Sequence, residues 1–124
     1  MKHDTHDAVD LAQRLIDMHF SIWNDANSQS RELKFEQVYT ADFFVADQSG
    51  VSAGYADVNR LIEQVQAGHA GFLFTPAPVT WNHGVGRVVW SYGPRSNPAQ
   101  VHGEDIFTIR DGKLASAHVF LDRP

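Results

Sequence analysis

Residues 101–122 read VHGEDIFTIRDGKLASAHVFLD, and they are the most informative part of the chain. Two strand-like runs flank Asp111-Gly112, and an Asp-Gly pair in such a place favours a tight hairpin turn, because primed turns need positive φ. A two-residue or four-residue loop places Asp105 opposite His118 on the neighbouring strand, whereas an odd-length loop would break that register. The sequence therefore predicts an antiparallel hairpin in which a carboxylate lies beside an imidazole.

Strand alternation places the two polar side chains on a largely apolar face, since residues two apart point the same way. Burying a carboxylate and an imidazole is costly unless they are hydrogen-bonded, and such a pair is a candidate for acid–base chemistry. A structural ion pair or a solvated face is the alternative interpretation. The other members of this predicted face are Phe107, Ile109, Leu114, Ser116 and Phe120.

Length and composition set the class of protein. The chain has 124 residues, 43% of them hydrophobic, which predicts one globular domain over residues 1–124. The net charge is −5 and no basic stripe is present, so nucleic acid is not an expected partner. The absence of cysteine excludes disulfides and cysteine-based zinc sites and fits a reducing cytoplasm. No run of about 18 apolar residues is found, so no membrane-spanning helix is expected.

The order of the predicted elements is helices first and strands last. Apolar spacing predicts helices over residues 7–27, 30–39 and 56–68. Strand-like segments cover residues 43–47, 51–53, 72–81 and 86–92, before the hairpin. Pro76 and Pro78 interrupt one of these strands, which must therefore be bent, bulged or at an edge. This order predicts an α+β fold with helices packed on one face of a curved antiparallel sheet.

Several landmarks in this order resemble the nuclear transport factor 2-like superfamily, in particular its SnoaL-like and ketosteroid-isomerase-like branch. The landmarks are IWND at 22–25, VYTADFFVAD at 38–47, Gly54 with the helix behind it, RVVWSYG at 87–93 and EDIFTIRDGKLASAHVFLD at 104–122. The resemblance covers nearly the whole chain. It implies a cone-shaped fold, in which a curved antiparallel sheet wraps around helices and encloses an apolar pocket, and members that are often homodimers.

The resemblance also implies roles for individual residues. In ketosteroid isomerases a general-base aspartate follows the first strand, and Asp47 matches it. A second acid on a late strand donates a hydrogen bond to the developing oxyanion, and Asp105 matches that position. Those isomerases carry a tyrosine on the first helix, where this chain has Leu15, His19 and Phe20 instead.

SnoaL-like cyclases and scytalone-dehydratase-like proteins use Asp and His, and a set of Asp47, Asp105 and His118, together with His19, fits them better. The implied chemistry is proton transfer at a carbon next to a carbonyl, as in isomerisation, cyclisation or dehydration, with no metal or organic cofactor.

The expected ligand is a small, mostly apolar molecule. Asp47 can equally serve only as the cap of the turn at 47–50, and the aromatic residues can be ordinary core. Trp90 and Phe107 are the preferred pocket walls, and a non-catalytic ligand-binding or dimerisation module is the alternative function. No metal-ligand spacing is present. The residues expected to contact a ligand are His19, Trp23, Tyr39, Phe43, Trp90, Tyr92, Phe107 and Phe120.

The opposite face of the predicted hairpin is apolar as well. Ile106, Ala117, Val119 and Leu121 would lie there, and a sheet that is apolar on both faces needs cover on both sides. The helices cover one face, so the sequence predicts a homodimer through the other. Cover by the C-terminal segment is the alternative.

Overall fold

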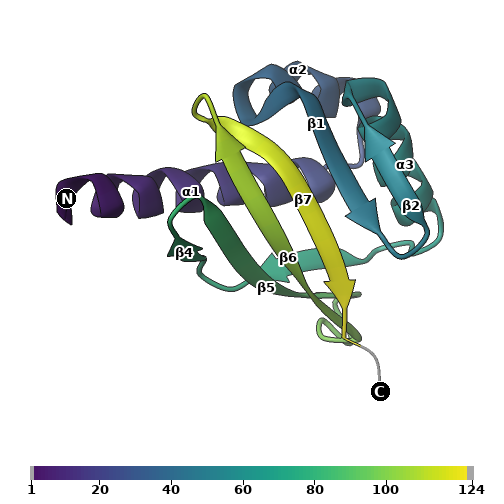
Figure 1. The fold of residues 1–124 in the computed structure, drawn as a ribbon. Helices are drawn as coiled ribbons and strands as arrows, with labels where there is room; N and C mark the ends of the chain where they lie inside the picture. Colours follow the sequence, from purple (N-terminus) through teal and green to yellow (C-terminus); the bar gives the residue numbers. More distant parts are fainter. Residues whose placement is uncertain (1, 123–124) are drawn as a thin grey trace.

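The computed structural model describes residues 2–122, with side chains from residue 7 onward. It contains three helices, α1 (Lys2–Trp23), α2 (Ser28–Val38) and α3 (Tyr55–Ala67). The strands are β1 (Tyr39–Asp47), β2 (Gly50–Ala53), β3 (Leu73–Pro76), β4 (Thr80–Asn82), β5 (Val85–Gly93), β6 (Val101–Arg110) and β7 (Lys113–Leu121). Figure 1 shows α1 crossing behind a curved sheet, with α2 and α3 near β1 and β2. The predicted α+β architecture is confirmed.

The sheet is open and has seven strands. Its order is β2-β1-β7-β6-β5-β3, with β4 also paired to β5. Only β1 and β7 run parallel, and every other pairing is antiparallel. The predicted 72–81 strand is divided, because β3 ends at Pro76 and β4 begins after Pro78, where proline cannot donate to the ladder. Among the described residues, no helix has the length and apolar character needed to cross a membrane.

The hairpin between β6 and β7 begins as predicted and then changes register. Asp111 and Gly112 have φ values of 54° and 75°, as a primed two-residue turn requires, and the residues that flank them are paired. Further along, Thr108 pairs with Ser116 because Ala115 is an extra residue in β7. Such a bulge moves every later side chain of the strand to the other face.

The predicted pairing of Asp105 with His118 is therefore wrong. Asp105 lies opposite Val119, and His118 lies opposite Ile106 on the outer face of the sheet, where its ring contacts Phe44 at 5.5 Å. The physical reason is that the bulge turns apolar side chains inward and leaves the imidazole in solvent. Ala117, Val119 and Leu121 face the interior instead, although the predicted register without a bulge placed them on the outer face. Phe120 moves the other way and is 56% exposed on the outer face.

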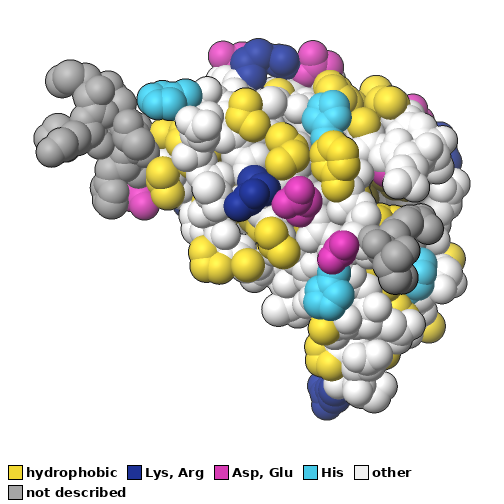
Figure 2. Space-filling model, turned by 60° about the horizontal axis from the view of Figure 1, so that its bottom comes forward, with side chains coloured by type: hydrophobic (Ala, Val, Ile, Leu, Met, Phe, Trp, Pro, Cys, Tyr) yellow, Lys and Arg dark blue, Asp and Glu magenta, His cyan; other side chains and the backbone are white. Residues whose placement is uncertain are grey.

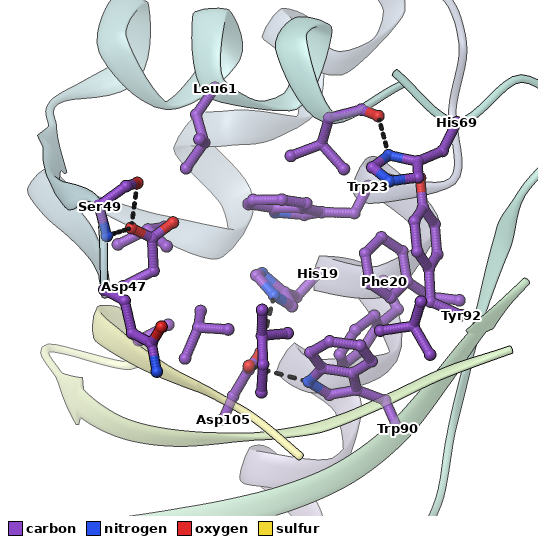
Figure 3. Close-up of a pocket in the computed structure, with 18 residues that line it drawn as sticks. His19, Phe20, Trp23, Asp47, Ser49, Leu61, His69, Trp90, Tyr92 and Asp105 are labelled. Atoms are coloured by element: carbon purple, nitrogen blue, oxygen red, sulfur yellow. Dashed lines mark hydrogen bonds and ion pairs between the residues drawn. The ribbon is translucent and has the colours of Figure 1, made fainter. Parts of the chain in front are cut away.

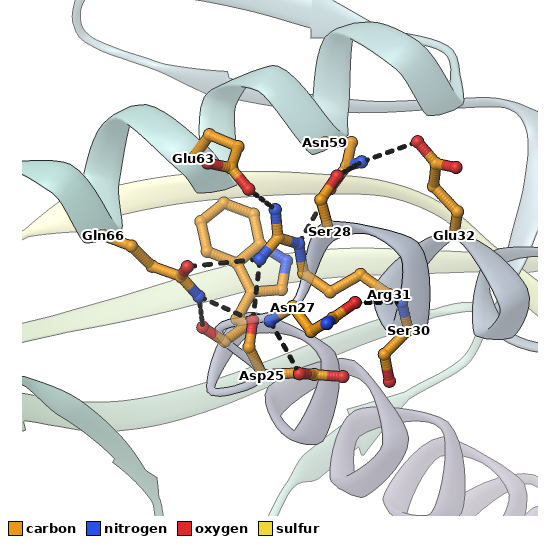
Figure 4. A network of polar contacts seen from close by, with 10 residues as sticks. Asp25, Asn27, Ser28, Ser30, Arg31, Glu32, Asn59, Glu63 and Gln66 are labelled. Carbon is orange, nitrogen blue, oxygen red and sulfur yellow. Dashed lines mark hydrogen bonds and ion pairs between the residues drawn. The ribbon is translucent and has the colours of Figure 1, made fainter.

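A buried arginine fastens the helices together (Figure 4). The side chain of Arg31 in α2 is fully buried, and its Nε donates to Asn59 Oδ1 at 2.8 Å. Its Nη1 donates to the backbone oxygen of Asp25 at 2.8 Å and to Gln66 Oε1 at 3.2 Å, and Nη2 pairs with Glu63. Removing an arginine charge from water is unfavourable unless hydrogen bonds and an ion pair such as these replace its hydration. The network fixes the chain that follows α1 against α3.

We expect Arg31→Ala to lower the free energy of unfolding by about 3 kcal/mol or more, because the buried oxygen of Asn59 and the partly buried oxygens of Asp25 and Gln66 lose their donor. Arg60→Ala is the matched control. The Arg60 side chain is 67% exposed and pairs with Asp57, so its loss should cost less than about 0.5 kcal/mol. Urea unfolding curves measure both values, and similar small losses in the two variants would contradict a fastening role for Arg31.

Candidate functional site

A cavity of about 440 Å³ lies between the helices and the inner face of the sheet (Figure 3). Its walls come from every layer of the fold and are mainly apolar, as is usual for sites that bind small molecules. Among the described residues, no lysine or arginine lines it. The lining residues are His19, Phe20, Trp23, Val45, Asp47, Gln48, Ser49, Leu61, Val65, His69, Phe74, Trp90, Tyr92, Val101, Asp105, Ala117, Val119 and Leu121.

The aromatic wall follows from α1 and from one asparagine beyond its end. His19, Phe20 and Trp23 share the buried stripe of the helix through their i, i+1 and i+4 spacing. Asn24 donates to the backbone oxygen of Phe74 at 3.0 Å and accepts from its N–H at 2.8 Å, which attaches β3 to the end of α1. The ring of Phe74 then stacks on a β5 tyrosine, with centroids 4.0 Å apart.

A polar pair lies within this apolar wall. Asp105 is 5% exposed and His19 is 3% exposed. The indole N–H of Trp90 donates to Asp105 Oδ1 at 2.9 Å, and His19 Nε2 lies 3.8 Å from Asp105 Oδ2. That separation is too long for a hydrogen bond, so the cavity side of the imidazole retains hydrogen-bonding capacity. The histidine beside Asp105 is thus His19 on α1, and not His118 on β7 as predicted from the sequence.

Tyr39 lies behind the imidazole, and its hydroxyl is 2.7 Å from His19 Nδ1. Burial raises the pKa of Tyr39, while the nearby N–H of Trp23 lowers this pKa and the charge of Asp105 raises it by smaller amounts, so the phenol stays protonated. The Trp23 N–H approaches the Tyr39 oxygen without hydrogen-bond geometry. It is the only buried side-chain polar atom without a partner among the described residues.

Asp47 lies on another wall of the same cavity. Its Oδ1 accepts from the N–H of Ser49 at 2.8 Å, from Ser49 Oγ at 2.6 Å and from the N–H of Gly50 at 3.1 Å. Figure 3 shows its second oxygen turned away from this turn toward the cavity. Asp47 therefore caps its turn and also lines the cavity, so the two interpretations of this residue are compatible. Asp47 and Asp105 line one cavity, as an acid–base site requires.

The residues expected to contact a ligand divide into two groups. His19, Trp23, Trp90 and Tyr92 line the cavity. Tyr39, Phe43 and Phe107 do not, because their side chains are fully buried in the core beneath it. The rings of Tyr39 and Phe43 stack at 4.0 Å, and Phe107 occupies the space left by the missing side chain of Gly86. His118 and Phe120 lie on the outer face and also do not line the cavity.

Sequence reasoning missed part of the cavity and the function of His19 as the partner of Asp105. A signal existed for His19, because it is a polar residue within an otherwise apolar helical stripe. None existed for Phe74, whose place depends on the bond to Asn24. The other missed wall residues are Phe20, Val45, Gln48, Ser49, Leu61, Val65, His69, Val101, Ala117, Val119 and Leu121. Among the described residues no group of three or more His, Cys, Asp or Glu could hold a metal ion.

Solved structures with the same fold are similar to this chain in structure, at low sequence identity. A protein of Agrobacterium tumefaciens strain C58, proposed to be an isomerase of the SnoaL-like family, aligns with a TM-score of 0.81 and 17% identity, over 89% of this chain and 96% of its own. A proposed polyketide cyclase of Sinorhizobium meliloti aligns with a TM-score of 0.70 and 17% identity, over 86% of this chain and 93% of its own. A proposed ketosteroid isomerase of Kribbella flavida DSM 17836 aligns with a TM-score of 0.70 and 14% identity, over 93% of this chain and 80% of its own.

No family model and no curated protein matches the sequence. The structural neighbours are SnoaL-like, nuclear transport factor 2-like and ketosteroid-isomerase-like proteins, so the resemblance inferred from the sequence landmarks is confirmed for the fold.

The raised pKa of Tyr39 predicts a loss of stability in alkaline solution. The unfolded chain loses this phenolic proton near pH 10, whereas the folded chain retains it, so folded protein binds more protons above about pH 10 and stability falls as the pH rises. Denaturant unfolding at several alkaline pH values should show Tyr39→Phe with a shallower fall, by up to about 1.4 kcal/mol per pH unit. Tyr55 and Tyr92, whose pKa values burial also raises, contribute equally to both proteins. Parallel curves would contradict this effect.

Proposed function

We propose that this protein catalyses cofactor-free proton transfer on a small carbonyl compound bound in the cavity. The observation that supports it is that Asp47 and the His19–Asp105 pair line one apolar cavity. Proton abstraction next to a carbonyl needs a base at the carbon and a donor at the oxygen, and excluding water strengthens both interactions. The descriptions of the structural neighbours as a proposed isomerase and a proposed cyclase agree with this class of reaction.

Each polar wall receives one role. Asp47 acts as the general base, using the carboxylate oxygen that its turn does not occupy. The His19–Asp105 pair binds the carbonyl oxygen and stabilises the negative charge that develops there. His19 thereby takes the place that the sequence had given to His118.

The cavity lining also restricts the substrate. Among the described residues, two carboxylates and no lysine or arginine line the cavity, so these residues would repel an anionic substrate without compensation. The aromatic rings of Phe20, Trp23, Phe74 and Trp90 offer flat apolar contacts. A neutral, mostly apolar ketone with few ring systems is the class that fits.

The bicyclic ketone 2-tetralone is a suitable probe, because its protons next to the carbonyl exchange measurably in D₂O. We expect the wild-type protein to accelerate this exchange, followed by proton NMR, and Asp47→Asn to reduce the acceleration by about 100-fold or more. His19→Gln should also reduce it. Asp42→Asn is the matched control, because Asp42 belongs to the same strand as Asp47 but does not line the cavity.

Binding of 2-naphthol, a planar analogue of the enol of that ketone, separates catalysis from simple binding. Fluorescence titration should show 2-naphthol binding and much weaker binding of the anion 2-naphthoate. Binding without any acceleration of exchange would favour the non-catalytic ligand-binding module. Equal exchange rates in Asp47→Asn and wild type would refute the assignment of Asp47 as the base.

We also propose that the outer face of the sheet pairs with a second copy of the chain. The exposed side chains that support this are Val51, Val89 and Phe120, which are more than 45% exposed, with Phe44 and Ile106 beside them in the register. Figure 2 shows one side of the molecule, on which hydrophobic side chains are interspersed with histidines and charged groups. That mixture is compatible with an interface whose polar groups also find partners.

Sedimentation velocity at micromolar concentration should give a dimer for the wild type. Phe120→Asp places a charge on the outer face and should shift the protein toward monomer, whereas Leu33→Asp, at an exposed position on α2, should not. A wild-type monomer at these concentrations would contradict the proposal.

A further inference from the structure

We infer that Tyr39 is a positioning residue that holds His19 in a single tautomer. In this tautomer Nδ1 accepts the hydroxyl proton of Tyr39 and the imidazole proton is on Nε2, so an N–H donor faces Asp105 and the cavity. The consequence is that His19, rather than Asp105, donates a hydrogen bond to the substrate oxygen. This last step rests on the proposed function, whereas the tautomer itself does not.

The single partner of the Tyr39 hydroxyl is the first argument. A neutral imidazole carries one proton, so the 2.7 Å contact has two possible directions. If Nδ1–H donated to the tyrosine, the buried hydroxyl proton would have no acceptor, since His19 is its only hydrogen-bond partner among the described residues. An unsatisfied buried donor is costly. If Tyr39 donates to Nδ1 instead, that proton is satisfied.

The Trp23 indole supplies a second argument for the same direction. Its N–H can only donate, and it approaches the Tyr39 oxygen without a partner of its own. A tyrosine that donates its proton to His19 keeps lone pairs directed at this N–H. The opposite arrangement would direct two N–H groups, those of His19 and Trp23, at one oxygen that also carries its own proton.

The other side of the ring agrees with this assignment. Nε2 faces Oδ2 of Asp105 at 3.8 Å, and a proton on Nε2 is attracted by a carboxylate, whereas a lone pair would be repelled. The second Asp105 oxygen already accepts from Trp90. Two N–H groups thus face one acidic side chain, whose oxygens can accept from both. The donor to the oxyanion is therefore His19 Nε2–H, in place of the protonated Asp105 implied by the ketosteroid-isomerase resemblance.

Long-range proton–nitrogen NMR on the ¹⁵N-labelled protein tests the tautomer without any ligand. The nitrogen chemical shifts, recorded at about pH 8.5, show which ring atom of His19 carries the proton. The His19 signals are identified by their loss in His19→Gln. We expect a protonated Nε2 in the wild type, and in Tyr39→Phe a tautomer ratio moved roughly fivefold toward protonated Nδ1. Tyr92→Phe, which alters a cavity tyrosine that does not bond His19, should leave the ratio unchanged.

A protonated Nδ1 in the wild type would overturn the inference, as would an unchanged ratio in Tyr39→Phe. Should Tyr39→Phe fail to fold, a coupling between the Tyr39 hydroxyl proton and His19 Nδ1 in the wild type measures the same bond, and its absence would count against the donor role of Tyr39. In the 2-tetralone assay Tyr39→Phe should lower kcat roughly fivefold with little change in KM. A wild type that has the expected tautomer but no catalysis would refute only the proposed function.

Discussion

One extra residue in β7 determines which chemistry the cavity contains. Ala115 has no partner in β6, so the strand beyond it presents Ala117, Val119 and Leu121 to the interior. Without this bulge the inner face of β7 would carry His118, and the cavity wall beside Asp105 would be a histidine on a strand rather than an apolar surface. The bulge lies close to the hairpin turn, and its effect extends to Leu121 because a register shift is transmitted along the rest of the strand.

Once β7 is apolar on its inner face, the buried charge of Asp105 must be satisfied by other elements. Trp90 on β5 donates to it, and His19 on α1 faces it, while Tyr39 on β1 supports the histidine from behind. Four separate elements therefore meet through these polar side chains. A buried polar network of this kind favours one arrangement of the elements that carry it. The polar site is thus part of what holds α1 at a fixed height on the sheet.

The sequence predicts the architecture well, because it depends on signals that are local. The Asp-Gly turn, the apolar stripe of α1 and the two prolines act within a few residues, and the structure contains the hairpin, helix and divided strand that they predict. The site is predicted less completely. Both sets of alternating positions along β7 contain apolar residues, so nothing in the sequence pattern identifies Ala115 as the bulge. The pairing of His19 with Asp105 joins residues far apart in the chain, and only the polar interruption of a helical stripe indicated that His19 had a special environment.

Hydrogen bonds outside the cavity hold the elements that form its walls in place. The Arg31 network holds the end of α1 against α3, and Asn24 attaches β3 to the same helix end, so the walls do not need to collapse onto each other to be stable. Close packing is instead concentrated below the cavity and at its edge. An added Cβ at Gly86 would lie 2.2 Å from the ring of Phe107, and one at Gly103 would lie 2.5 Å from Trp90. The absence of a side chain at Gly103 lets the Trp90 indole lie across β6 and reach Asp105, so a backbone position with no functional group helps to set the polarity of the site.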